Sequence, residues 1–328
     1  MRALRAVTAR RRARSHGRAH AGATPGDVLF QSLSAAAAFG LLLLLALVTL
    51  ILLLGAGPSI QTFGFSFFTG AVWNPPAHPP EVYGAVPFVY GTLVTAGLAL
   101  LLGVPVSLGI AIFLSELAPP WLRVPLTYVI ELLAAIPSVV FGLWGVFVLA
   151  PVMRDSVEPA VQSVFGFLPI FSGTPVGTDV FTAGVILAIM IIPTISAISR
   201  EAFLAVPQTQ REAALAIGAT HWETTRMAVL TYARSGILGA VILGLGRAVS
   251  ETMAVTMLIG NRNAIFGSLF DQGQTIASWI ANNFTEAGPL ETSALIELGL
   301  VLMLVAVLVT VVARLFLTRV LRVLEVTE

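Results

Sequence analysis

The sequence predicts an all-α, polytopic membrane protein with six transmembrane helices. Of its 328 residues, 57% are hydrophobic and 11% are charged, and the mean hydropathy is +0.92. Soluble domains carry about 25% charged residues. Six stretches are apolar over about the 20 residues that an α-helix needs to cross a bilayer. Such helices satisfy their own backbone hydrogen bonds, as the hydrocarbon requires.

The expected spans are residues 31–55, 87–114, 125–150, 179–199, 236–259 and 293–315. With the N-terminus inside the cell, fifteen of the 18 arginines fall in cytoplasmic segments. Arg154 and Arg262 fall outside, and Arg247 is left within the membrane. The positive-inside rule therefore predicts that both termini are cytoplasmic. The three external segments are rich in aromatic residues, which fits either anchoring at the membrane interface or a docking face for an external partner.

Two residue types are missing from the chain. It has no cysteine, which excludes disulfides, thiolate metal sites and cysteine nucleophiles. It has no lysine either, since all 18 basic residues are arginine, and a P-loop needs a lysine to reach the β- and γ-phosphates. If the protein works with ATP, the ATPase is another polypeptide.

Three segments are expected along the chain. Residues 1–27 are predicted to be a disordered cytoplasmic tail, because seven arginines fall within residues 1–18. That tail either binds anionic headgroups or only fixes the topology. Residues 28–318 form the six-span domain, with a cytoplasmic loop at about 200–234, and residues 319–328 form a short cytoplasmic tail.

The loop at residues 200–234 is predicted to be a short helix, a tight turn and another short helix. Pro207 suits the first turn of a helix, and good helix formers follow it. Gly218 stands where a C-terminal cap belongs, and Thr220 to Glu223 read as a capping box. Two interpretations fit: an amphipathic pair lying on the membrane, or a plug that seats in a groove of a cytoplasmic motor.

Arg247 and Glu251 are the ionisable residues of the stretch from residue 236 to 259. A charge at mid-bilayer costs roughly 2.5–3.5 kcal/mol on insertion scales, so such residues mark functional sites by default. On a continuous helix the two would share a face, one turn apart. They either neutralise each other and lock two spans together, or Arg247 offers its donors to a tetrahedral oxyanion while Glu251 keeps the arginine oriented.

The neighbouring face of this fifth span is built of small residues, which allow helices to pack closely. These residues are Gly236, Ala240, Gly244 and Ala248. Glu131 lies in the predicted third span, about 9 Å from its cytoplasmic end, whereas Arg247 lies about 17 Å deep, at 1.5 Å of rise per residue. The two side chains are long enough to be neighbours at these depths.

No catalytic site is discernible in the sequence. The histidines are scattered and fit no metal-ligand spacing, and they are His16, His20, His78 and His221. We therefore expect no catalytic residue, no metal and no cofactor. Asp179 and Glu297 fall near external ends of spans, where hydration of the interface would lower the free-energy cost of their charges. Glu116 falls at an internal end of a span.

Part of the cytoplasmic loop resembles the EAA loop of the permeases of ATP-binding cassette (ABC) importers. The matching residues are Glu212, Ala213, Ala214, Gly218 and Leu230. The family pattern ends in Ile-x-Leu-Pro, and Ala228 and Thr231 depart from it. Without that proline, the sequence no longer indicates a sharp turn where the chain leaves the loop, although the loop itself is still predicted.

Three further segments are similar to the C-type permease of phosphate-specific (Pst) ABC importers: Tyr90–Leu93, Glu131–Gly145 and Gly246–Val255. With the loop, the resemblance covers roughly residues 57–317. It implies a type I, MetI-like permease fold in a bacterial inner membrane. It also implies that Arg247 and Glu251 take part in phosphate passage. From its depth in the third span, we expect Glu131 on the same pathway.

The resemblance further implies an assembly. Its members would be a homologous A-type permease, two copies of an ATP-binding subunit that hydrolyses ATP in place of this chain, an extracytoplasmic phosphate-binding protein and membrane lipid, without nucleic acid. Three alternatives stay open: a permease for another oxyanion such as molybdate, sulfate or phosphonate, an ion-coupled secondary carrier, and a structural or signalling subunit. Secondary carriers often show inverted repeats, and no convincing repeat is present in this sequence.

Overall fold

A computed structural model describes residues 25–75 and 80–326, the part beyond residue 315 as helical backbone. The chain divides into two compact units, residues 1–54 and 55–328. The described part of the first unit is the apolar helix α2 (Pro25–Gly55). Most of the expected arginine-rich tail lies outside the described residues.

Within the described residues, six helices are long and apolar enough to cross a membrane, which confirms the predicted number. They cover Gly26–Gly55, Val86–Leu117, Ser138–Phe165, Val180–Leu204, His221–Ser250 and Pro289–Leu315. The backbone of the last of these helices, α16 (Pro289–Val326), continues through most of the expected C-terminal tail. The protein is therefore a multi-pass membrane protein by the length and composition of its helices.

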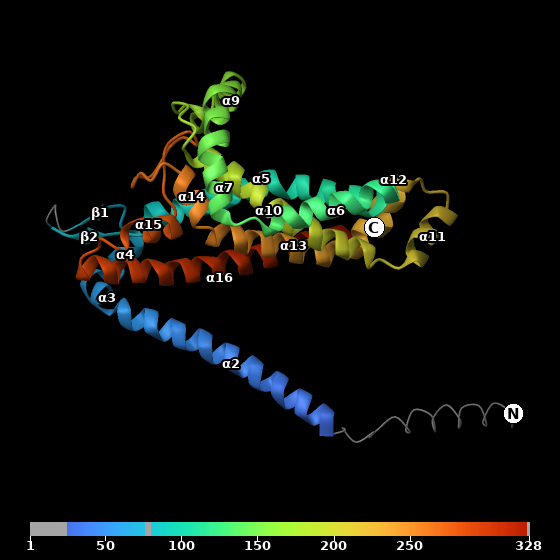
Figure 1. Cartoon of the computed structure of the whole chain (residues 1–328), viewed down its shortest axis with the longest axis horizontal. Helices are drawn as coiled ribbons and strands as arrows, with labels where there is room; N and C mark the ends of the chain where they lie inside the picture. The colour runs from blue at the N-terminus through green and yellow to red at the C-terminus, as the bar shows by residue number, and fades with distance from the viewer. Residues whose placement is uncertain (1–24, 76–79, 327–328) are drawn as a thin grey trace. The chain divides into compact units, whose positions relative to one another are not determined.

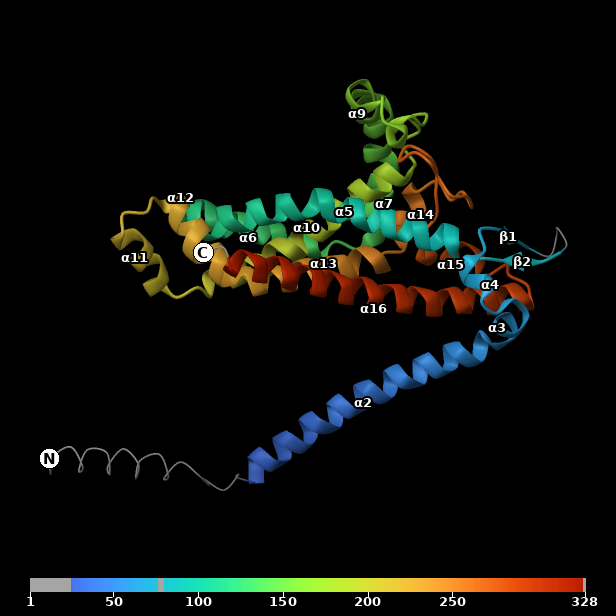
Figure 2. The same cartoon turned by 180° about the vertical axis from the view of Figure 1, so that it is seen from behind.

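Helix α10 (Val180–Leu204) is the centre of the second unit, because 61% of its most apolar window is buried. It packs against α5 (Val86–Ile112) and α13 (Thr231–Ser250), and α16 completes this bundle (Figures 1 and 2). Gly103 of α5 brings the two helices close, since a Cβ there would crowd Ile191. A core of this kind holds its helices by close packing rather than by the hydrophobic effect, which is weak between helices in lipid.

The third span differs from the predicted continuous helix over residues 125–150. Helix α6 (Pro120–Ala135) ends before Pro137, and α7 (Ser138–Trp144) begins after it. Pro137 has no N–H to donate and pushes Ile136 into an extended conformation, with ψ 128°. The helical path then continues through η2 (Gly145–Leu149), α8 (Ala150–Val152), η3 (Met153–Val157) and α9 (Glu158–Phe165). In both views, α7 to α9 leave the bundle at a steep angle.

The fifth span also differs from its predicted bounds, residues 236–259. Helix α12 (His221–Thr224), the π-helical turn η5 (Thr225–Leu230) and α13 form one continuous helix from the loop into the membrane. That helix ends at Ser250, because Glu251 is extended (φ −68°, ψ 130°). A separate helix, α14 (Met253–Leu258), follows.

The two helices that follow these breaks, α7 and α14, pack against each other. Gly142 and Gly145 of α7 leave the room for this contact. A Cβ on Gly142 would meet the sulfur of Met257, and one on Gly145 would meet the side chain of Leu258. Irregular backbone at membrane depth is tolerated where protein or a cavity surrounds it, and such broken helices are typical of transporters.

The segments that connect the spans at the end opposite the loop are short and partly helical. They comprise α3 (Gly57–Phe63), α4 (Ser66–Thr69), η4 (Pro169–Phe171) and α15 (Ile276–Asn283). Strands β1 (Trp73–Asn74) and β2 (Val82–Tyr83) pair antiparallel, with Trp73 opposite Tyr83.

The aromatic residues of the segments expected to be external divide into two groups. Some, such as Phe65 and Phe167, are exposed, as both expectations require, whereas others form a buried core, contrary to both. Phe67, Trp73 and Tyr83 are almost fully buried, and Phe88 stacks on Trp279 at a ring-centroid distance of 4.9 Å. Burial raises the pKa of the Tyr83 hydroxyl well above its ordinary range. These rings stabilise the fold from inside rather than anchor it at an interface.

Asp179 and Glu297 are buried, so the expectation that hydration makes them inexpensive is wrong. Asp179 accepts the N–H of Thr182 at 2.9 Å and caps the N-terminus of α10. Glu158 lies beside it and accepts the hydroxyl of Thr182 at 3.2 Å. Glu297 accepts the hydroxyl of Ser59, which comes from a distant part of the sequence. Hydrogen bonds therefore offset part of the cost of burying these carboxyls.

Replacing Asp179 with asparagine is expected to reduce the pH dependence of stability. Burial, and then the neighbouring Glu158, raises the pKa of Asp179 to about 7 from its ordinary 3.8. A carboxyl with a raised folded-state pKa stabilises the fold fully below about pH 4, and this contribution is lost as pH rises through 7. Unfolding midpoints of the detergent-purified protein between pH 4.5 and 7.5 should fall less for Asp179→Asn than for the parent. Equal slopes would contradict the assignment.

Candidate functional site

Arg247 lies in the last turn of α13 and is half-buried. Its Nη1 donates to the hydroxyl of Thr194 on α10 at 3.0 Å. Ion pairs among the described residues include Arg154–Asp155, Arg200–Glu201 and Arg211–Glu116, and Arg247 forms none with Glu251. The guanidinium of Arg247 is therefore held by a neutral partner and not neutralised by a carboxylate in this conformation, and the locking pair with Glu251 is not formed.

The small-residue face of α13 explains why Arg247 is presented in this way. Ala240, Gly244 and Ala248 are buried against the core around α10, and a Cβ on Gly244 would crowd Ile195. The prediction of a closely packed face is thus confirmed. Because that face is fixed, the adjacent face that carries Arg247 has a fixed direction as well.

Glu251 does not share a helical face with Arg247, so that prediction is wrong. The helix ends at Ser250, and the extended backbone of Glu251 removes the one-turn relation. Its Oε1 accepts the N–H of Ala254 at 3.4 Å, at the start of α14. Glu251 therefore lies at the junction between the two helices and is half-buried there.

Glu131 lies on α6 and lines a cavity of about 270 Å³ between α6 and α10. Thr127 from α6 and Ser196, Arg200 and Glu201 from α10 are among its other lining residues. Thr194, which holds Arg247, is four residues from Ile198 and seven from Glu201, so these three residues share one face of α10. The cavity and the Arg247 contact thus lie along the same side of α10.

The loop at residues 200–234 contains the first predicted helix and turn. Helix α11 (Gln208–Ala216) follows Pro207, and Gly218 adopts φ +91°, which suits glycine at a helix end. Thr220 and Glu223 form the predicted capping box. The second helix is not a separate short one, since it runs on into the fifth span. The proline that would end it in the family pattern is replaced by Thr231, so nothing interrupts the helix there.

The residues that resemble the EAA loop divide between surface and core. Glu212, Ala213 and Gly218 are exposed, whereas Ala214 is buried. Leu230 packs against a small core that joins the loop to the nearby ends of α5 and α10. The apolar side chains of Ile217 and Trp222 are 76% and 58% exposed beside them. The loop thus offers an apolar surface with a polar rim, as a docking plug would.

Sequence reasoning missed two contacts at this site. Thr194 had no distinguishing signal, since threonine is ordinary in a span. Glu116 was noted without a role, yet it forms a largely buried ion pair with Arg211 of the loop, at 2.9 Å. The two residues of that pair are 95 positions apart, so no local pattern could reveal it.

A family model, the binding-protein-dependent transport system inner membrane component, matches residues 103–325. The permease of a bacterial alginate ABC transporter, crystallised with its pentasaccharide-bound periplasmic protein, has the same fold. Its TM-score is 0.60 at 16% sequence identity, over 90% of this chain and 96% of that chain. The all-α permease fold predicted from the sequence is confirmed.

The chain therefore belongs to the family of binding-protein-dependent inner-membrane transport components, a family of transport proteins rather than enzymes. Its relatives include the phosphate transport system permease protein PstC of Pasteurella multocida, 47% identical over 90% of this chain and 92% of the relative. The protein of the same name from Haemophilus influenzae is 46% identical over 89% of this chain and 93% of the relative. A probable PstC from Methanocaldococcus jannaschii is 36% identical over 88% of this chain.

Proposed function

We propose that this chain is the transmembrane permease subunit of an ATP-driven phosphate importer and forms half of its translocation pathway. The observation that carries this proposal is Arg247, an arginine within a membrane helix that is held by a hydroxyl instead of a carboxylate. Such a guanidinium keeps most of its donors available to an oxyanion. The relatives named phosphate transport system permeases support phosphate as the cargo.

Three residues are assigned to the pathway. Arg247 would receive the anion with paired N–H donors, which match two oxygens of a tetrahedral oxyanion. Glu251, at the helix junction, would keep the anion from binding too tightly, because a transport site must release as well as bind. Glu131, in the cavity beside α10, would face the anion on its way to the cytoplasm and disfavour its retention there.

The remaining assignments concern the assembly. The loop at residues 200–234 would dock on one of two ATP-binding subunits through the surface around Glu212, Ala213 and Gly218. A homologous permease would supply the other half of the pathway, and an extracytoplasmic binding protein would deliver phosphate. Both termini would be cytoplasmic in a bacterial inner membrane, with residues 1–27 and 319–328 as tails around a permease domain at 28–318.

The test is uptake by the complete transporter reconstituted in vesicles. Radiolabelled phosphate should accumulate only when ATP and the binding protein are both present. Unlabelled phosphate should compete fully, and equal concentrations of sulfate, molybdate or phosphonate should compete weakly. ATP-dependent uptake of one of those anions in preference to phosphate would replace the assigned cargo. Uptake without any ATP-binding subunit would instead indicate a secondary carrier.

A further inference from the structure

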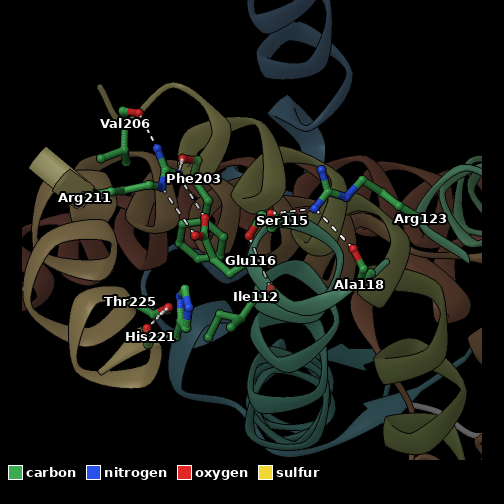
Figure 3. Close-up of polar contacts among 10 residues, drawn as sticks. All are labelled: Ile112, Ser115, Glu116, Ala118, Arg123, Phe203, Val206, Arg211, His221 and Thr225. Atoms are coloured by element: carbon green, nitrogen blue, oxygen red, sulfur yellow. Dashed lines mark hydrogen bonds and ion pairs between the residues drawn. The ribbon is translucent and has the colours of Figure 1, made fainter. Parts of the chain in front are cut away.

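The cytoplasmic end of α5 is a π-helical turn, η1 (Phe113–Leu117), that is bound by two arginines from other elements (Figure 3). The N–H of Ala118 donates to the carbonyl of Phe113 at 2.7 Å, which closes the wide turn. A π-helical turn interrupts the regular hydrogen-bond ladder of a helix, and such turns often lie at functional positions. This turn lies where α5 meets the loop at residues 200–234.

On one side, Arg211 of α11 binds the turn through Glu116. Its Nη2 and Nε contact the two carboxylate oxygens at 2.9 and 3.4 Å. The same guanidinium donates to the carbonyl oxygens of Phe203 and Val206, at the C-terminal end of α10. Both charged side chains are largely buried, at 16% and 13% exposure. Arg211 thus connects α11, which we call the coupling helix, to both α5 and α10.

On the other side, the side chain of Arg123 on α6 binds backbone carbonyl oxygens of the same turn. Its Nη2 donates to the carbonyl oxygens of Ser115 and Ala118, at 3.2 and 3.3 Å. Figure 3 shows Arg211 and Arg123 reaching the turn from different directions. We call Arg211, Glu116 and Arg123 the arginine clamp.

Helix α6 depends on such end contacts more than its neighbours do. It has no buried residue along its length, whereas α5 and α10 have many. Its packing against the bundle is therefore looser than that of α5 and α10, because its inner face is only half-buried. Because α6 also carries Glu131 at the cavity beside α10, a displacement of its cytoplasmic end changes the shape of that cavity.

We propose that the arginine clamp is the mechanical link that passes movement of the coupling helix α11 through the 113–117 turn to α6. The inference rests on the proposed function, since it assigns the residues that connect the motor to the pathway. Movement of α11 pulls Glu116 through a charge-assisted pair, which resists separation more than a neutral contact does. The turn moves as a unit and carries Arg123 with it, so that α6 and Glu131 follow the motor.

The test uses the complete reconstituted transporter and measures phosphate taken up per ATP hydrolysed. Glu116→Gln, Arg211→Gln and Arg123→Gln should each lower this ratio by about tenfold, a usual size for coupling between sites, while ATP hydrolysis continues. Arg123→Gln is the most discriminating of the three variants, because Arg123 contacts neither α11 nor Glu116. The double variant Glu116→Gln/Arg211→Gln should be no worse than the worse single variant, because the two residues act as one pair. Arg314→Gln changes an exposed arginine near the end of the sixth span and should keep the parental ratio.

Each other outcome overturns the link. If all three variants keep the parental ratio, the clamp carries no movement. If Arg123→Gln alone keeps it, the link ends at the turn and does not reach α6. If the ATP-binding subunit no longer co-purifies with the Arg211 or Glu116 variant, the pair only anchors the loop. If the parent complex itself takes up no phosphate, the proposed function fails first, and the link falls with it.

Discussion

Replacing Arg247 with glutamine is expected to lower phosphate uptake about a hundredfold, while the complex assembles and still hydrolyses ATP. Glutamine keeps a donor for the hydroxyl of Thr194 but removes the charge and the paired N–H geometry. Each hydrogen bond to a charged group contributes about 1.5–3 kcal/mol, and every 1.4 kcal/mol is a factor of ten. Losing two such bonds to the anion accounts for the expected size. Uptake of radiolabelled phosphate by reconstituted vesicles measures it.

Two further variants separate charge from geometry at this position. Arg247→Lys keeps the charge and loses the fork, so uptake should fall between the parent and Arg247→Gln. Thr194→Val removes the hydroxyl that holds the guanidinium and should cost a few-fold, because the arginine remains but is less well oriented. If Arg247→Gln takes up phosphate at the parental rate, the arginine has no part in transport, and the pathway must be sought elsewhere.

The site could be predicted from the sequence where its signals are local. Gly218 and the Thr220–Glu223 capping box specify a turn and a helix start through their own backbone preferences, and both are present. The small-residue face of α13 follows from a four-residue period and packs as expected. Arg247 was singled out because its charge is costly in hydrocarbon, and that reasoning needs no tertiary information.

The geometry between Arg247 and Glu251 could not be predicted in the same way. No glycine or proline lies between Arg247 and Met253, so the pattern favours an unbroken helix. The break is instead compatible with tertiary packing, in which α14 lies against the glycines of α7. Likewise, Asp179 is buried beside Glu158 and Thr182, and Glu297 is buried against Ser59, which is distant in the sequence. Tertiary contacts of this kind override local helix propensity, and they produce no periodic pattern in the sequence.

Three glycines of the segments similar to phosphate permeases leave room for close contacts in this fold. Gly142 and Gly145 leave the room that α14 needs to pack against α7. Gly91 admits the backbone before α15, and the adjacent Thr92 hydroxyl accepts the N–H of Ile276 at 3.0 Å. These glycines therefore set how the broken segments approach the helices. The charged residues Glu131, Arg247 and Glu251 lie within two of the same three segments.

Replacing Gly91 with alanine is accordingly expected to destabilise the protein by about 2–3 kcal/mol, near the upper range for overpacking in a tight core. A Cβ at this position would overlap the carbonyl oxygen of Gln274, which is backbone and has little freedom to move aside. Gly97→Ala on the same helix is the matched control. It faces open space, so it should stabilise α5 by about 0.5–1 kcal/mol, the usual preference for alanine over glycine within a helix. Unfolding of the purified protein in detergent should therefore shift in opposite directions for the two variants. Equal shifts would show that the contact at Gln274 is not a constraint on the fold.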